Sequence, residues 1–256
     1  MAKPVTVASL DDGAFWRVTV GAGKGNVLDE ATMRALALVF RDAQESSHLK
    51  AICLEGAGPH FSFGASVSEH LPEKVEHMLD HFHALIRTVV ESSVVVVAAV
   101  RGQCLGGALE LVTVSHRVFA SPDAKFGQPE IVLGVFAPVA SVVLADRVGR
   151  GHAEDLCLTG RVVSAPEAEA MGLVHEVTDA DPADAALGWL RSHLGPKSAA
   201  SLRLAVRAVR TDLSAKLRDT LPVLERLYLD ELMATTDAVE GLQAFLEKRA
   251  PVWKDA

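Results

Sequence analysis

The amino-acid sequence predicts an α/β fold that ends in a helical region. Up to about Gly149, strand-like and helix-like segments alternate along the chain, a pattern typical of layered α/β folds. Beyond that point most segments carry apolar residues at helical spacing. No Pro-, Gly- or Ser-rich linker and no internal repeat divides the chain. We therefore expect one α/β core over residues 1–195, followed by a helical region over residues 196–256.

The alternation is clearest in the first half of the chain. Residues 15–20 have the β-branched and aromatic content of a strand, and residues 29–44 have the apolar spacing of an amphipathic helix. Residues 51–54 predict a buried strand, and residues 72–91 predict a second amphipathic helix. The continuous β-branched run at 94–100 is typical of a strand that is covered on both faces.

Capping patterns organise the second half. Residues 164–167 form an S-x-x-E capping box, and Gly172 is placed to end that helix. Residues 198–209 and 217–232 are periodic and apolar on one face. The D-x-x-E pattern at 237–240 predicts the start of the last helix.

Composition excludes several classes of protein. The 256 residues include 25 basic and 33 acidic side chains, a formal net charge of −8, and 49% are hydrophobic. The chain is too apolar to be disordered, and without a basic block it is unsuited to nucleic acid or an anionic membrane as its main partner. The apolar run at 94–100 is far shorter than the ~18 residues of a membrane helix.

The cysteines and the amino terminus predict a cytoplasmic protein. Cys53, Cys104 and Cys157 form no C-x-x-C pair, and their odd number favours a reducing compartment. The amino terminus has no apolar stretch long enough for a signal peptide.

Two patterns suggest cofactor sites, and both have simpler interpretations. The glycine-rich stretch at 21–26 completes no phosphate-binding motif, so we expect a tight turn. Histidines gather at positions 70 to 83, and His77 and His81 are four apart on a predicted helix. Without a nearby cysteine or a placed acid they make a poor zinc site. We therefore expect a solvated helix face, and neither a metal nor a redox cofactor.

Three segments carry residues suited to chemistry. GQCLGGALE at 102–110 follows a predicted strand, so Gly107 would open a helix with free N–H groups, and Glu110 lies in its first turn. A first-turn glutamate also simply favours the helix dipole. FSFGASVS at 61–68 has small residues that let backbone N–H groups approach a ligand. In the segment 125–134, Glu130 is placed in an apolar neighbourhood that would raise its pKa and suit it to proton transfer.

In this order, these segments resemble the crotonase (enoyl-CoA hydratase/isomerase) superfamily. The resemblance covers nearly the whole chain and also includes LTGRVVSAPEAEAMGLV and EGLQAFLEKRAPVWK. It implies a ββα spiral core with an acyl-CoA site and a helical carboxyl-terminal trimerisation region. The resemblance therefore predicts a homotrimer or a dimer of trimers, with coenzyme A carried by the substrate and no separate cofactor.

The resemblance assigns roles to particular residues. The backbone N–H groups of Ala65 and Gly107 match an oxyanion hole for the thioester oxygen, where enolate charge develops. Glu110 and Glu130 match the two glutamates that act on the water in hydratases. Isomerases of the family often keep only the second, so the pair favours addition or removal of water.

Further positions match substrate or CoA contacts of the family, and some depart from its pattern. The resemblance places Ser66, Val67, Ser68, Phe136 and Pro138 near the acyl-CoA; Ser66 replaces the usual acid. Typical hydratases have a glycine at position 138 whose N–H helps to hold the water, and proline has no N–H. Phe136 and Val139 add bulk to the acyl pocket.

Phe245 and Lys248 match positions that reach the CoA of a neighbouring subunit. The simpler interpretation is that Phe245 packs in the core and that Lys248 is solvated.

The variant stretch QPEIVLGVFAPVAS, with GQCLGGALE and AEDLCLTG, resembles the branch of the family that hydrates cyclohexa-1,5-diene-1-carbonyl-CoA in anaerobic aromatic degradation. It implies a lyase that adds water to a conjugated ring thioester. A straight-chain 2-enoyl-CoA hydratase or an isomerase is the first alternative. A non-catalytic RNA-binding or scaffolding protein, disfavoured by the negative charge, and a thioester hydrolase with one glutamate as base are the others.

Overall fold

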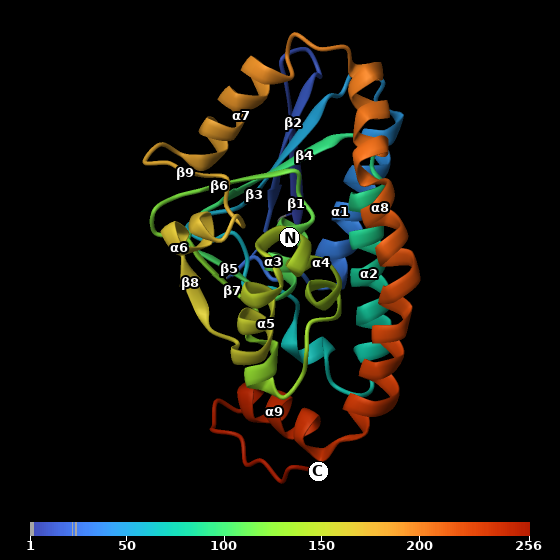
Figure 1. Ribbon diagram of the computed structural model, residues 1–256, viewed down its shortest axis with the longest axis vertical. Coiled ribbons are helices and arrows are strands. Elements are labelled where there is room, and N and C mark those ends of the chain that lie inside the picture. Colours follow the sequence, from blue (N-terminus) through green and yellow to red (C-terminus); the bar gives the residue numbers. More distant parts are fainter. Residues whose placement is uncertain (1–2, 22, 24) are drawn as a thin grey trace.

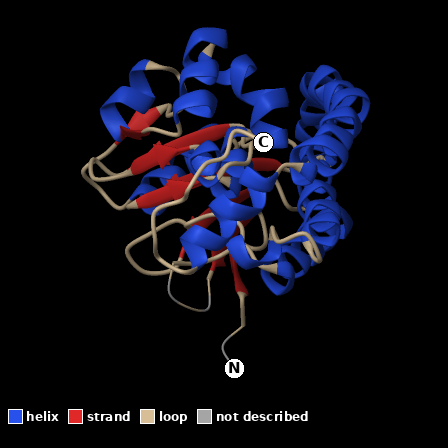
Figure 2. Cartoon of the chain, turned by 90° about the horizontal axis from the view of Figure 1, so that it is seen from below, coloured by secondary structure: helices blue, strands red, loops and turns tan. Residues whose placement is uncertain are grey.

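The computed structural model describes residues 3–21, 23 and 25–256, which form two sheets surrounded by helices (Figure 1, Figure 2). The larger sheet has six strands in the order β1-β2-β3-β4-β6-β9. β1 and β2 pair antiparallel, and all other neighbours in this sheet are parallel. Its strands are β1 (Val5–Leu10), β2 (Phe15–Val20), β3 (Ala51–Gly56), β4 (Val95–Val100), β6 (Arg117–Ala120) and β9 (Glu176–Val177).

The smaller sheet joins the two segments that carry the predicted glutamates. It consists of β5 (Gln103–Leu105), β7 (Lys125–Gly127) and β8 (Val162–Ser164), in that order. β5 and β7 are parallel, with Leu105 opposite Gly127. Since β5 leads straight into the helix that bears Glu110, and β7 into the turn that bears Glu130, this pairing brings the two turns to the same edge of the sheet.

Helices cover both faces of the larger sheet. α1 and α2 pack on one face and α7 on the other, while α8 runs alongside α2 (Figure 1). The long helix α8 ends in a π-helical segment, η3, and a 3-10 turn, η4. The helices are α1 (Glu30–Glu45), α2 (Val75–Glu91), α3 (Gly107–Thr113), α4 (Pro138–Val148), α5 (Arg150–Thr159), α6 (Ala165–Ala170), α7 (Pro182–His193), α8 (Ala199–Arg226) and α9 (Thr236–Leu246), with shorter turns η1 (Val67–Glu69), η2 (Pro129–Leu133), η3 (Leu227–Glu231) and η4 (Leu232–Ala234).

Hydrophobic burial explains this arrangement. Every residue of β3 and β4 is buried, as expected for parallel strands that helices cover on both faces. α1 and α2 bury their apolar stripes against one face of the sheet. Leu217, Leu221 and Leu242 from the carboxyl-terminal region belong to the same cluster, so this region contributes to the core around the candidate site.

The structure confirms most predicted elements and corrects two. The strand at 15–20 and the helices after Asp29 and Ser164 form as predicted, and both residues cap their helices with side-chain oxygens. The two helices predicted at 198–209 and 217–232 are instead mainly one continuous helix, α8, which breaks into η3 and η4 near its end. The last helix begins after Thr235, whose hydroxyl accepts from the N–H of Ala238, and not at Asp237.

Asp237 has another role. Its carboxylate accepts hydrogen bonds from the backbone N–H groups of Lys254 and Asp255, so it fixes the chain end instead of capping the helix. Among the described helices, none combines the length and the apolar character needed to cross a membrane.

Candidate active site

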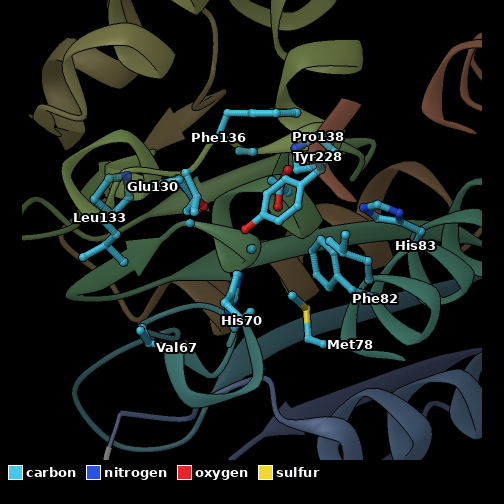
Figure 3. Close-up of a pocket in the computed structure, with 18 of the residues that line it drawn as sticks. Val67, His70, Met78, Phe82, His83, Glu130, Leu133, Phe136, Pro138 and Tyr228 are labelled. Atoms are coloured by element: carbon cyan, nitrogen blue, oxygen red, sulfur yellow. The ribbon is translucent and has the colours of Figure 1, made fainter. Parts of the chain in front are cut away.

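One cavity brings together most of the predicted site residues (Figure 3). Its walls come from the 61–68 segment, α2, the start of α3, the η2 turn with the loop that follows it, and the π-helical segment η3. Apolar side chains make up most of these walls, and two glutamates also line the cavity. The lining residues are Phe63, Ala65, Val67, His70, Met78, Leu79, Phe82, His83, Gly106, Gly107, Glu110, Pro129, Glu130, Leu133, Val135, Phe136, Ala137, Pro138 and Tyr228.

Glu110 lies in the first turn of α3 and is 4% exposed. Its Oε1 accepts a hydrogen bond of 2.7 Å from the backbone N–H of Ala140, in the first turn of α4. Burial raises the pKa of the Glu110 carboxyl, while the N–H groups of Ala140 and Val139 act in the opposite direction because they stabilise the ionised form. The amino terminus of α4 therefore holds this carboxylate in place.

Glu130 lies in η2, directly after Pro129. Its Oε1 is 3.4 Å from Nε2 of Gln128, while its buried Oε2 has no hydrogen-bond partner among the described residues. Burial raises the pKa of the Glu130 carboxyl, and the charge of Glu110 raises it further. Two neighbouring buried carboxyl groups with raised pKa values favour a state in which the pair shares one proton near neutral pH.

Two backbone N–H groups meet beside the carboxyl groups. A Cβ built on Gly107 would lie 3.4 Å from the nitrogen of Ala65, and one built on Gly64 would lie 3.3 Å from the nitrogen of Gly107. Within the described residues, neither N–H donates a backbone hydrogen bond in the loops and turns. Gly107 begins α3, where N–H groups have no partner inside the helix. These two donors are therefore available to an oxygen atom of a ligand.

The structure places the other predicted residues in two groups. Val67, Phe136 and Pro138 line the cavity together with the oxyanion-hole residues and the glutamates. Four residues do not: Ser66 and Ser68, whose hydroxyl groups contact each other at 3.0 Å, and Phe245 and Lys248, which are exposed on the single chain.

Of the two side chains predicted to narrow the acyl pocket, Phe136 and Val139, only Phe136 lines the cavity. Phe136 lines the cavity, but Val139 is completely buried in the core and is absent from the cavity wall. Pro138 is the first residue of α4, a position where proline is well tolerated. Its ring forms part of the wall, and the N–H groups after it are directed to Glu110 and not to the cavity.

Three polar side chains of the cavity were not predicted from the sequence as site residues. Tyr228 comes from η3, and His70 and His83 come from segments around and within α2. Nδ1 of His83 lies 2.6 Å from Oε1 of Glu225 on α8, while the buried Nε2 of His83 has no partner among the residues described. Nδ1 of His70 lies 2.9 Å from the carbonyl oxygen of Ser66. Their types alone give no signal, because their position depends on how α2 and α8 pack.

His77 and His81 are partly exposed to solvent, as predicted, but the residues around them differ from those expected. The sequence placed no acid beside His77 and His81, whereas the structure brings the Glu30 carboxylate to 3.4 Å from Nε2 of His77. The guanidinium of Arg34 lies in this cluster, 2.8 Å from Oε1 of Glu30 and 3.2 Å from Nε2 of His81.

Comparisons with known proteins agree on the family. A family model described as "Enoyl-CoA hydratase/isomerase" matches residues 18–256. The "Cyclohexa-1,5-dienecarbonyl-CoA hydratase" of Thauera aromatica is 46% identical over 254 residues, which are 99% of this chain and 98% of that protein. A "Probable enoyl-CoA hydratase" of Rhizobium meliloti is 35% identical over 232 residues, 90% of each chain.

The fold is shared with solved structures. A crystal structure of an enoyl-CoA hydratase from Mycobacterium avium subsp. paratuberculosis K-10 matches with a TM-score of 0.85 at 26% identity, over 98% of this chain and 99% of that one. The predicted ββα spiral core with a helical carboxyl-terminal region is therefore the crotonase fold.

Proposed function

The chain belongs to the enoyl-CoA hydratase/isomerase family and is a hydro-lyase of the enoyl-CoA hydratase type, and we propose that its substrate is cyclohexa-1,5-diene-1-carbonyl-CoA. The observation that carries this proposal is a pair of glutamates beside two free backbone N–H groups in an apolar cavity: Glu110 is buried, and Glu130 has a buried carboxyl oxygen. The identity to the Thauera aromatica hydratase supports the choice of a ring substrate.

The reaction follows from the charges of the site. Ala65 and Gly107 donate their N–H groups to the thioester oxygen, and these donors stabilise the negative charge that develops there as an enolate. In a dry, preorganised site one such donor is worth about 3 kcal/mol of barrier lowering. Phe82 and Leu133 belong to the apolar wall that excludes bulk water from the reacting atoms.

The proton that the two glutamates share balances the addition. The ionised carboxylate removes a proton from water as the water oxygen bonds to a carbon of the conjugated system. The π electrons move to the thioester oxygen, and the protonated carboxyl then gives its proton to a ring carbon. Glu110 suits the role of base, because its carboxylate receives the N–H of Ala140, and Glu130 suits the role of acid, because its Oε2 has no donor among the residues described.

The walls of the cavity favour a flat ring. The rings of Phe136 and Tyr228 meet edge to face at a centroid distance of 5.2 Å, and Pro138 closes the wall beside them. A flexible straight chain fills such a space less completely. One added or missing methylene in an apolar pocket changes binding by only about 1–3 kcal/mol, so we expect the ring thioester to be favoured roughly tens- to hundredsfold.

The CoA portion has a second cavity available. This cavity is lined by residues 23 and 25–27 and by residues of the 57–63 segment, and Phe63 lines both cavities. Phe245 and Lys248 are exposed at the carboxyl-terminal end of the chain and are free to contact the CoA of a neighbouring subunit in a homotrimer or a dimer of trimers. Ser66 and Ser68 flank Val67, which lines the first cavity.

The three cysteines are free, and Cys53 and Cys104 are buried. This agrees with folding in a reducing compartment, and we propose that the protein is cytoplasmic.

The test is a mass-resolved product assay with a panel of acyl-CoA thioesters. We expect cyclohexa-1,5-diene-1-carbonyl-CoA to gain the mass of one water with a higher kcat/KM than crotonyl-CoA. Glu110→Gln and Glu130→Gln should each lower kcat at least about a hundredfold and keep CoA-ester binding. If crotonyl-CoA is the better substrate by tenfold, the enzyme is a straight-chain hydratase. Full activity of either variant would refute the two-glutamate mechanism.

A further inference from the structure

Tyr228 presents an unpaired hydroxyl inside the candidate active site. It is the single tyrosine of the sequence, it is 1% exposed, and its hydroxyl has no hydrogen-bond partner among residues 3–21, 23 and 25–256. A buried hydroxyl without a partner costs free energy of folding, so such groups are rare and need an explanation. A ligand that completes the hydrogen bond supplies one.

The local backbone delivers this side chain to the cavity. Tyr228 lies in η3, a π-helical segment that directly follows the long helix α8. Single π-helical turns are rare in proteins, and those that do occur are frequently found at functional sites. Figure 3 shows Tyr228 between Glu130 and His83, with its hydroxyl on the side that faces Glu130.

Apart from the N–H groups of Ala65 and Gly107, which face the thioester oxygen in the proposed reaction, the donors nearest the two glutamates are engaged or absent. The N–H of Ala140 is bound to Glu110, and Pro138 has no N–H. The Nδ1 atoms of His83 and His70 face a carboxylate and a carbonyl, so their N–H groups point to those acceptors. The Tyr228 O–H is a side-chain donor beside the two glutamates, and it has no acceptor within the described part of the cavity.

We propose that the Tyr228 hydroxyl donates a hydrogen bond to the oxygen of the water that adds to the substrate, and to the same oxygen in the hydroxylated product. The inference rests on the proposed hydratase function. Tyr228 transfers no proton: the water proton goes to one glutamate, and the carbon receives its proton from the other. The hydroxyl instead fixes the water oxygen and, in the reverse reaction, stabilises it as it leaves.

The state of the hydroxyl suits this role. Burial raises the pKa of Tyr228 above its ordinary value, and the charges of Glu130 and Glu110 raise it further. The side chain therefore remains a neutral donor throughout the pH range in which the glutamates exchange protons.

The first test is Tyr228→Phe, which keeps the ring and removes only the donor. We expect kcat to fall roughly a hundred- to a thousandfold, as for loss of one preorganised donor, with a KM for the thioester that changes less than threefold. Because the lost hydroxyl has no partner among the residues that the structure describes, the Tm should stay the same or rise. Thr211→Val is the matched control, since it removes an exposed hydroxyl from α8 that bonds only the carbonyl of Arg207; it should keep full activity.

The second test uses the wild-type protein and needs no variant to fold. A hydroxycyclohexenecarbonyl-CoA product should perturb the ultraviolet absorption of the single tyrosine, whereas cyclohexanecarbonyl-CoA, which lacks the ring hydroxyl, should leave it largely unchanged. Equal spectra with both thioesters would overturn the inference. So would wild-type kcat in Tyr228→Phe, or a fall in its Tm of more than a few degrees, which would assign the hydroxyl a structural role.

The outcomes separate the inference from the function on which it rests. If the wild type hydrates the ring thioester and Tyr228→Phe does so equally well, only the inference is wrong. If the wild type hydrates no thioester of the panel, the proposed function is wrong and the inference falls with it.

Discussion

Replacement of Glu130 by glutamine should make the protein more stable at high pH, although it impairs the reaction. In the folded protein, burial and the charge of Glu110 raise the pKa of Glu130 from 4.5 to about 8. In the unfolded chain the carboxyl loses its proton near 4.5. Between these values the folded state holds more protons than the unfolded state, so the free energy of unfolding falls as pH rises. Glutamine does not ionise, so this pH-dependent fall in the free energy of unfolding does not occur in Glu130→Gln.

The magnitude follows from the pH interval. Each pH unit over which only the folded state holds the proton costs about 1.4 kcal/mol. From pH 6 to pH 9, the folded carboxyl keeps its proton for about two units, up to a pKa of about 8. The wild type should therefore lose about 3 kcal/mol more than Glu130→Gln over this range. At pH 6 the wild type already carries about 2 kcal/mol of this penalty, because pH 6 lies above the pKa of 4.5 at which the unfolded carboxyl ionises.

Urea unfolding at pH 6 and pH 9, followed by tryptophan fluorescence, measures this difference. Glu154→Gln is the control, because Glu154 is exposed on α5 and its replacement should change stability equally at both pH values. If the free-energy difference between Glu130→Gln and wild type is the same at both pH values to within about 0.5 kcal/mol, the carboxyl is not held protonated, and the shared-proton mechanism loses its basis.

Four further predictions concern the frame of the site and the assembly. Asp29→Ala should lower the free energy of unfolding by about 1 kcal/mol, because Oδ1 of Asp29 accepts the N–H of Thr32 at 2.9 Å and caps α1. Chemical denaturation measures this loss, and a turnover assay should show an unchanged kcat. Gly64→Ala should lower both stability and kcat, since Gly64 has a φ of +93° and its Cβ would lie 2.5 Å from the carbonyl oxygen of Leu105, against the oxyanion hole. Light scattering at micromolar concentration should give the mass of a trimer or a hexamer, and a monomer would reject the proposed assembly. In that assembly Lys248→Glu should raise the KM for acyl-CoA more than it lowers kcat, because a contact remote from the reacting atoms acts on ground and transition states alike; an unchanged KM would place Lys248 in solvent.

Local patterns were sufficient to predict much of the fold. The strand at β4, the helix that follows Asp29 and the cap at Ser164 depend on residues close in sequence, so the sequence predicts them correctly. The same reasoning failed at the last helix, where Thr235 and Asp237 are both good caps. Asp237 is engaged by the backbone at Lys254 and Asp255, a contact between segments that local rules do not describe.

The chemical character of the site was also visible in the sequence, but its assembly was not. The glycines after β5 and the glutamates after β5 and β7 indicate donors and acids, and the structure brings Ala65, Gly107, Glu110 and Glu130 around one cavity. The pairing of Leu105 with Gly127 in the smaller sheet achieves this. That pairing is a tertiary contact, because two short strands of three residues carry too little pattern to identify each other.

Only the tertiary structure decided what surrounds the glutamates. Val139 carries the same apolar signal as Phe136, yet the helical turn that starts at Pro138 buries Val139 in the core and leaves Phe136 in the cavity wall. Tyr228 lies about a hundred residues from Glu130 in the sequence, and it reaches the cavity because α8 packs along α2 and then unwinds into a π-helical turn. Which groups are able to do the chemistry depends on residue type, so the amino-acid sequence is sufficient to identify them. The packing of distant helices decided which of those groups share one dry cavity, because burial and hydrogen-bond partners arise only when the whole chain is folded.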